Sequence, residues 1–207
     1  MPLLNFQQTK KLLLKYKIPI YQTEIFNSEK KAEKFVKKIG YPVVLKIFSL
    51  TILHKTDMGG VKMNIKNNKE FKKAFFDLIK IKRIEGILVQ KMGAGKEIVL
   101  GMKRDFQFGP VLMFGLGGIF VEALKDVSFR ICPVSKKEAI KMIKEIKGYS
   151  ILKGQRGEKP LAIEKLAPLI TKLSNLSLKE KNVKEIDLNP LIINEKGVWA
   201  ADFKFLV

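Results

Sequence analysis

Apolar residues recur along this chain with two different periods, and the change of period predicts its elements. A spacing of three or four residues places apolar side chains on one side of helices that begin after Asn5, after Ser28 and near Phe71. Short β-branched runs between them predict strands at 20–26, 43–48, 61–65 and 86–92. The first half of the chain is therefore expected to be an α/β unit.

The pattern changes after the glycines at Gly93 and Gly95. Alternation predicts antiparallel strands, with a turn at 104–105 and a pairing of 119–124 with 127–134 through 125–126. Helical spacing returns in a helix capped by Ser135 and in a helix that Pro168 either starts, lying in its first turn, or kinks. Two strands follow, around 185–193 and 198–205. We place a boundary between two subdomains, 1–92 and 93–207, at these glycines.

Composition indicates a folded protein with no membrane segment. The chain has 207 residues, of which 46% are hydrophobic and 29% charged, so it can bury a sizeable core. No stretch approaches the roughly 20 apolar residues of a membrane span, and the start lacks the apolar core of a signal peptide. The single cysteine, Cys132, is expected to be a small core residue. We expect a cytoplasmic protein.

The net charge of +20, from 40 Lys and Arg against 20 Asp and Glu, is high enough to attract polyanions. The lysines nevertheless run through every segment, and no arginine-rich or aromatic-interleaved nucleic-acid motif is present. A solvated basic surface is the favoured interpretation, and a basic nucleic-acid-binding module is an alternative.

One charge lies where the pattern predicts burial. Lys46 falls within the apolar run 43–48, and an ammonium there needs an anionic partner because burying it alone costs several kcal/mol. A carboxylate of the same protein or the phosphates of a ligand would serve. A structural ion pair, or a lysine whose stem is buried and whose head reaches water, explains the residue equally well.

The only histidine, His54, lies in the polar segment that follows this strand and ends in Gly59 and Gly60. Neighbouring lysine, threonine and aspartate side chains at 55–57 are groups that bind a phosphoryl group and orient an imidazole. A solvated loop histidine is the alternative.

Two further groups suggest phosphate and metal chemistry. Asp187, Asn189 and Asp202 offer oxygen ligands of the kind that suit Mg²⁺, although they could equally be cap and turn residues. The glycines of 115–118 could bring backbone N–H groups close to a phosphate, or could form a simple turn. This segment is neither a P-loop nor a dinucleotide-binding fingerprint.

Three stretches of the sequence together resemble a known family. These are LKIFSLTILHKTDMGGVK, FGPVLMFGLGGIFVEALKDVSFR, and DLNP followed by an aspartate. They resemble the β subunit of the ADP-forming acyl-CoA synthetases, or acetate:CoA ligases, and the similarity runs along essentially the whole chain. It implies an ATP-grasp fold of the α/β (α+β) class, with ATP or ADP held between two subdomains and with Mg²⁺.

The resemblance also implies roles for individual residues. His54 matches the histidine that is transiently phosphorylated in the family, Arg130 matches an arginine near the transferred phosphoryl group, and Lys46 would neutralise phosphate charge. A hinge at Gln90, Lys91 and Met92 would read the adenine edge, and Glu97 would bind the ribose. The remaining implied residues are Gly117 and Gly118 of the active-site glycine loop and Asp187, Asn189 and Asp202 of the magnesium site.

The family's CoA-binding and acyl-transfer modules do not occur in these 207 residues. The resemblance therefore implies a CoA-binding α subunit as partner, in an α2β2 assembly that handles the acid and CoA, with no nucleic acid. The implied reaction is acyl-CoA + ADP + phosphate = acid + ATP + CoA. A self-contained ATP-dependent ligase is the alternative enzyme.

Overall fold

The computed structural model describes residues 2–49, 52, 58–118, 125–154 and 160–207. The chain divides into two compact units, one formed by residues 21–93 and the other by residues 1–20 together with 94–207. The first twenty residues therefore belong to the same unit as 94–207, whereas the predicted subdomains, 1–92 and 93–207, placed them in the other one. The reason is packing, because Leu13 and Ile18 are buried in the core of the larger unit and Leu3 pairs with Leu206.

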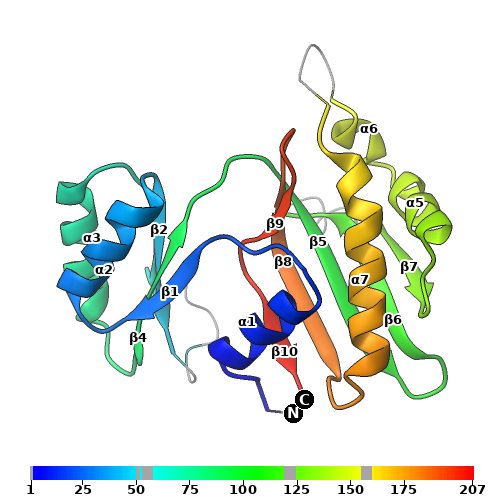
Figure 1. The fold of residues 1–207 in the computed structure, drawn as a ribbon, viewed down its shortest axis with the longest axis horizontal. Coiled ribbons are helices and arrows are strands. Elements are labelled where there is room, and N and C mark those ends of the chain that lie inside the picture. The colour runs from blue at the N-terminus through cyan, green and yellow to red at the C-terminus, as the bar shows by residue number, and fades with distance from the viewer. Residues whose placement is uncertain (1, 50–51, 53–57, 119–124, 155–159) are drawn as a thin grey trace. The chain divides into compact units, whose positions relative to one another are not determined.

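The smaller unit is a four-stranded sheet covered by two helices. Its elements are β1 (Thr23–Phe26), α2 (Glu29–Ile39), β2 (Val43–Phe48), β3 (Val61–Ile65), α3 (Asn68–Ile79) and β4 (Gly86–Lys91). The strands lie in the order β1-β4-β2-β3, and each pair is antiparallel. Helices α2 and α3 cover one face of this sheet (Figure 1). The predicted helices and strands of this region are confirmed.

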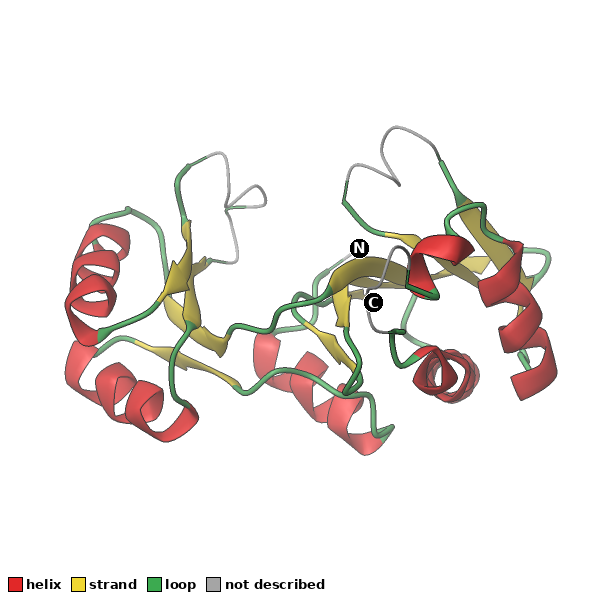
Figure 2. Cartoon of the chain, turned by 90° about the horizontal axis from the view of Figure 1, so that it is seen from above, coloured by secondary structure: helices red, strands yellow, loops and turns green. Residues whose placement is uncertain are grey.

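The alternation of side chains along β2 produces two different faces. Val43, Leu45 and Ile47 are fully buried in one apolar cluster with the inner sides of α2 and α3. Burying each such side chain contributes about 1.5–3 kcal/mol. The residues between them, including Lys46, point to the opposite face because the side-chain period of a strand is two. Seen from above, the helices of each unit lie on one side of that unit's sheet (Figure 2).

The larger unit contains one sheet with helices packed on it. Its helices are α1 (Phe6–Lys15), α5 (Lys136–Glu145), α6 (Tyr149–Leu152) and α7 (Leu166–Lys179), with a short 3-10 turn at Ile163–Lys165. Its strands are β5 (Lys96–Asp105), β6 (Gly109–Leu116), β7 (Val127–Ile131), β8 (Glu185–Ile193), β9 (Val198–Ala200) and β10 (Lys204–Leu206). They follow the order β10-β8-β5-β6-β7, and β9 pairs with β8.

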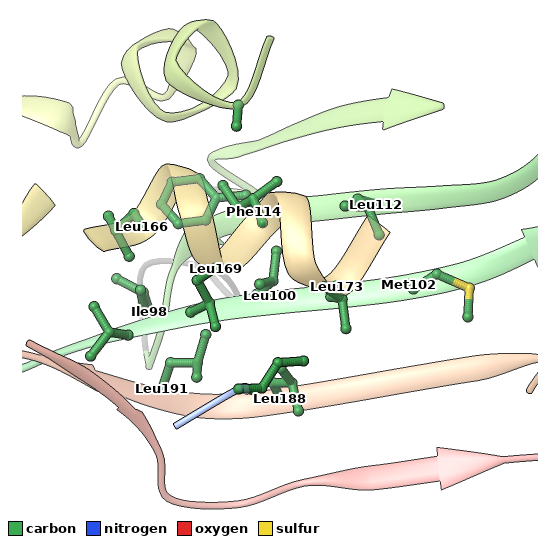
Figure 3. Packing of buried hydrophobic residues seen from close by; sticks show 14 of the residues in the cluster. Ile98, Leu100, Met102, Leu112, Phe114, Leu166, Leu169, Leu173, Leu188 and Leu191 are labelled. Atoms are coloured by element: carbon green, nitrogen blue, oxygen red, sulfur yellow. The ribbon is translucent and has the colours of Figure 1, made fainter. Parts of the chain in front are cut away.

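Helix α7 supplies the centre of this unit's core. Leu166, Leu169 and Leu173 face the sheet, where they meet Ile98, Leu100 and further side chains of β5, β6 and β8 (Figure 3). The proline of α7 lies in its first turn, as predicted, where a missing N–H costs nothing. Among the residues that the structure describes, no helix is long and apolar enough to cross a membrane.

The structure corrects two details of the predicted second half. Strand β7 pairs with β6. The predicted pairing of 119–124 with 127–134 lies outside the described residues. The short helix α6 falls in a stretch predicted as loop. The predicted last strand is broken into β9 and β10, because β8 carries a bulge at Asn189–Pro190 and the Pro190 carbonyl accepts the N–H groups of Ala201 and Asp202.

A charged contact joins α1 to the end of α7. The carboxylate of Glu180 accepts hydrogen bonds from Lys15 Nζ at 2.7 Å and from the Tyr16 hydroxyl at 2.8 Å. These two donors lower the pKa of Glu180, and the same carboxylate raises the pKa of Lys15. The end of α1 is thereby joined to the residue that follows α7.

Glu180→Gln is expected to lower stability in a pH-dependent way. A carboxyl group whose folded-state pKa is depressed stabilises the fold above its unfolded pKa of about 4.3, and this contribution is lost as pH falls through the folded pKa. Urea midpoints of the variant should therefore lie below those of the wild type at pH 7, and the gap should close in acid below about pH 4. Glu195→Gln, in an exposed turn, is the control. An equal gap at pH 7 and in strong acid would contradict this contribution.

Candidate functional site

Lys46 lies on the face of the smaller sheet that α2 and α3 leave uncovered. Strand β2 is internal, and Lys46 stands opposite Leu88 of β4 and Val61 of β3. Its side chain is half-buried, and its same-face neighbours Val44 and Gln90 are buried. An ammonium in such surroundings is stabilised by negative charge, so Lys46 places a cation on the face of the sheet that the helices leave uncovered.

The predicted hinge residues at the end of β4 do not all point to the same face of the sheet. Gln90 stands opposite Val44, on the face that also carries Lys46. Lys91 points to the helix-covered face, where its Nζ donates to the carbonyl oxygens of Gly40 at 3.1 Å and Tyr41 at 2.7 Å. Carbonyl groups at a helix C-terminus carry partial negative charge, which suits an ammonium. The structure therefore groups Gln90 with Lys46 and places the Lys91 side chain elsewhere.

The backbone after Gln90 is fixed by hydrogen bonds and by close packing. The N–H of Lys91 donates to the Gln22 carbonyl and the N–H of Met92 to the Pro42 carbonyl, at 2.9 and 3.1 Å. At Gly93 an added Cβ would lie 1.8 Å from the hydroxyl oxygen of Tyr21, so only glycine fits. The two ends of the smaller unit, at 21–22 and 91–93, therefore lie against each other.

In the larger unit, Glu97 meets the glycine loop that follows β6. The N–H of Gly117 donates to the Glu97 carbonyl at 2.8 Å. A Cβ at Gly117 would lie 3.0 Å from the Cβ of Glu97, and one at Gly118 would lie 3.3 Å from its Oε2 atom. Gly118 also has a φ of +63°, a conformation that favours glycine. Glycine at these positions thus leaves room for the exposed carboxylate of Glu97.

The bulge of β8 brings the three predicted metal ligands into one area. Asp187 precedes the bulge, and exposed Asn189 is part of it. Asp202 lies between β9 and β10, where its N–H donates to the Pro190 carbonyl. Burial raises the pKa of Asp187; Lys204 opposes this shift, and the negative charge of Asp202 adds to it. The two carboxylates are therefore close enough to repel each other.

Glu97 and Asp187 share one face of the larger sheet. Gly101 stands opposite Asp187 on β8, and Glu97 lies on the same side of β5 as Gly101 because their separation is even. The alternate residues, such as Leu100, enter the core beneath the helices. The open face thus carries the glycine loop, the glutamate and the carboxylates. No group of three or more His, Cys, Asp or Glu side chains suited to a metal occurs in the described part of the chain.

Arg130 lies on the opposite, helix-covered side of this sheet. It stands opposite Leu112, which is buried in the core, and its guanidinium pairs with Glu138 and Glu145 of α5. These carboxylates raise the pKa of Arg130. The structure therefore does not bring Arg130 together with Glu97 and Asp187. His54 lies outside the described residues.

Lys204 is a neighbour of this site that the sequence interpretation missed. It stands directly opposite Asp187 on β10 and lowers the pKa of that carboxyl group, against the larger effect of burial. The alternation of Asp202, Phe203 and Lys204, with Phe203 packed against the core, is the sequence signal that could have revealed it.

Comparison with known proteins gives consistent matches along the whole chain. The model of the ATP-grasp domain family matches residues 2–207. A protein of Pyrococcus furiosus named acetate–CoA ligase [ADP-forming] I subunit beta is 47% identical over 208 residues, which cover 97% of this chain and 90% of that protein. Acetate–CoA ligase [ADP-forming] I of Archaeoglobus fulgidus is 47% identical over 200 residues, which cover 93% of this chain but 29% of that longer protein.

Solved structures of a dinucleotide forming acetyl-coenzyme A synthetase 1 from Ca. Korarchaeum cryptofilum are also similar. The complex with coenzyme A and Ca-AMPCP has a TM-score of 0.92 at 41% identity and covers 97% of this chain and 91% of that one. A complex with coenzyme A and Mg-AMPPCP, whose phosphohistidine segment points towards the nucleotide binding site, has a TM-score of 0.88 at 37% identity, covering 99% and 92%.

Proposed function

Because the chain belongs to the ATP-grasp domain family, alongside the β subunits of the ADP-forming acetate–CoA ligases, we propose that it moves a phosphoryl group between a partner's phosphohistidine and Mg·ADP. It would act as the nucleotide-handling half of the reaction acyl-CoA + ADP + phosphate = acid + ATP + CoA. The observation that carries this proposal is the open face of the larger sheet, where Glu97, the glycine loop and the Asp187 area lie together.

The oxygen groups around the β8 bulge fit a hard divalent cation. Asp187, Asn189 and Asp202 would hold Mg²⁺, which prefers oxygen ligands and usually takes one or two protein carboxylates beside nucleotide phosphates. Burial and the neighbouring Asp202 both disfavour the ionised form of Asp187, and a bound cation would offset that cost. When bound, Mg²⁺ would neutralise charge on the phosphates of the nucleotide.

Several residues would bind the nucleotide itself. Glu97, exposed beside Gly117 and Gly118, would accept hydrogen bonds from ribose hydroxyls, and the glycines would allow phosphates to approach the backbone. Gln90, Lys91 and Met92 would present the end of β4 to the adenine, with the Lys91 ammonium already bound to Gly40 and Tyr41.

Phosphate charge would be neutralised by Lys46 and Arg130. Lys46 already faces the uncovered side of its sheet. Arg130 can serve only if its guanidinium exchanges the carboxylates of Glu138 and Glu145 for phosphate oxygens. Such groups accelerate phosphoryl transfer by positioning and by electrostatic stabilisation.

His54 would carry the phosphoryl group. A neutral imidazole is a good nucleophile near pH 7, and the N–P bond it forms stays reactive enough to break in favour of the terminal oxygen of ADP. Each transfer then yields ATP and returns the imidazole to its free form. Gly59 beside the segment has a φ of +64°, which suits a hinge.

A CoA-binding α subunit would complete the enzyme, in an α2β2 assembly in the cytoplasm and without nucleic acid. The β-subunit name of the Pyrococcus furiosus relative supports this, since a subunit of that name has a counterpart. The longer Archaeoglobus fulgidus relative supports it too, because most of that protein lies outside the matched region.

Partner dependence is the test of this function. The purified chain, given acetyl-CoA, ADP, phosphate and Mg²⁺, is expected to make no ATP until the α subunit of the same source is added, because residues 2–207 match the ATP-grasp domain and a relative of similar length is named a β subunit. ATP formation is followed by luminescence. Turnover by the chain alone would instead support a self-contained ligase. Polynucleotide binding that falls steeply with salt and displaces nucleotide would favour the nucleic-acid-binding module.

A further inference from the structure

An apolar strip crosses the open face of the larger sheet at its β7 edge. It consists of Phe129 and Ile131 of β7 and Val111 and Met113 of β6, and Phe106 and Phe108 lie in the turn that leads into β6. Val111 stands opposite Ile131 and Met113 opposite Phe129, so these four side chains share one face. The turn leads into the end of β6 where the Pro110 carbonyl accepts the N–H of Cys132, the residue that follows β7.

The strip is exposed to an unusual degree for apolar side chains. Phe106 is 91% exposed, Phe108 58%, Phe129 54% and Ile131 52%. At about 150–250 Å² for each ring, the three phenylalanines together expose on the order of 400 Å². Apolar surface of this extent at one edge of a sheet typically marks an interaction site. A standard interface buries about 800 Å² on each partner, so the strip would form its apolar centre.

The strip runs directly to the candidate metal ligands. Cross-strand register places Phe129, Met113, Gly101 and Asp187 in one row over four neighbouring strands. The missing side chain at Gly101 leaves room for Met113, whose methyl carbon lies 3.8 Å from where a Cβ of Gly101 would be. A body bound on the strip would therefore also lie beside the carboxylates.

Strand β7 adds a second reason for a partner. Within the described part of the sheet it is the edge strand, and an edge with apolar side chains invites pairing with another chain. In the proposed function a partner subunit exchanges a phosphoryl group with this chain, and in the Archaeoglobus fulgidus relative most of the polypeptide lies outside the region that matches this domain. In that relative, the ATP-grasp domain is therefore accompanied by a polypeptide large enough to cover the strip.

We propose that this apolar strip is the surface on which the CoA-binding α subunit docks, with Phe129 and Ile131 at its centre and the Phe106–Phe108 turn at its rim. This inference rests on the proposed function. Docking at the strip brings the partner next to Asp187 and excludes water from that side of the site, while the helix-covered face stays free.

The test compares strip variants with a matched exposed phenylalanine. Phe76 of α3 is 60% exposed and belongs to the smaller unit, so Phe76→Asp is the control for Phe129→Asp. A second strip variant, Phe106→Ser with Phe108→Ser, changes only turn residues and keeps the test valid if an aspartate in β7 impairs folding. Binding to the α subunit of the same source is measured by biolayer interferometry, and Mg·ADP binding by calorimetry.

Both strip variants are expected to raise the Kd for the α subunit by at least about tenfold, as loss of central interface residues does, and to leave Mg·ADP affinity within about twofold. The control should bind like the wild type. If the wild type and the strip variants bind the α subunit equally, the docking surface is wrong although the function stands. If the wild type does not bind it at all, the proposed function fails as well. A chain that self-associates through the strip, as judged by light scattering of the variants, would overturn the assignment in favour of a second copy.

Discussion

Asp202→Asn is expected to weaken binding of Mg·ADP by at least about 100-fold, since changes in the groups that merely support metal ligands already cost 10–100-fold. Asp202 lies at the break between β9 and β10, where it faces the β8 bulge and raises the pKa of Asp187. Its carboxylate would hold Mg²⁺ together with Asp187 and Asn189. Calorimetric titration of ADP with and without Mg²⁺ measures the effect.

The two titrations form a cycle that separates metal binding from nucleotide binding. Omitting Mg²⁺ should weaken ADP binding to the wild type strongly and to Asp202→Asn only slightly, because the variant has already lost the cation. Glu185→Gln is the control, since it removes one negative charge from the same side of β8 and should change affinity by less than about twofold. Unchanged Mg·ADP affinity in Asp202→Asn would show that the metal site has been placed wrongly.

The elements of this fold were predictable wherever burial on one side sets a clear period. Helices α2 and α7 and strands β2 and β8 follow directly from the spacing of apolar residues. The break between β9 and β10 was not predictable in this way, because it depends on the bulge at Asn189–Pro190 in a neighbouring strand. Such pairing is a tertiary effect that no local pattern encodes.

The candidate site residues were chosen by residue type and by resemblance, but neither of these predicts the faces on which they lie. Lys91 and Gln90 are adjacent in sequence, yet one reaches carbonyl groups at the end of α2 and the other shares the Lys46 face. Arg130 was predicted near phosphate, whereas the structure pairs it with two glutamates of α5. Those ion pairs join residues 8 and 15 positions apart, and only the packing of α5 on β7 brings them together.

His54→Asn is expected to have the largest effect on turnover. Asparagine keeps a polar side chain of similar size but offers no nucleophilic nitrogen, so the phosphoryl group has no carrier. ATP formation by the chain with its α subunit should fall by at least about 1,000-fold, while calorimetry should give Mg·ADP affinity within about twofold of the wild type. Coupled luminescence measures the first quantity.

Met58→Leu is the companion variant, since it changes an exposed apolar side chain next to the same segment and leaves the imidazole in place. We expect it to retain most of the turnover. Near-normal ATP formation by His54→Asn would leave the phosphate relay without support, and would indicate that the histidine only contacts phosphate in place.

The most direct measurement of the central claim is mass spectrometry of the chain after incubation with Mg·ATP, with and without the α subunit. His54 is the only histidine of the 207 residues, so a phosphohistidine on this chain can lie only there, and peptide fragmentation distinguishes it from phosphate on a lysine. The account predicts such a phosphate on His54, lost when ADP is added and absent from His54→Asn. An active wild-type enzyme that never carries phosphate on His54, even when quenched during turnover, would contradict it.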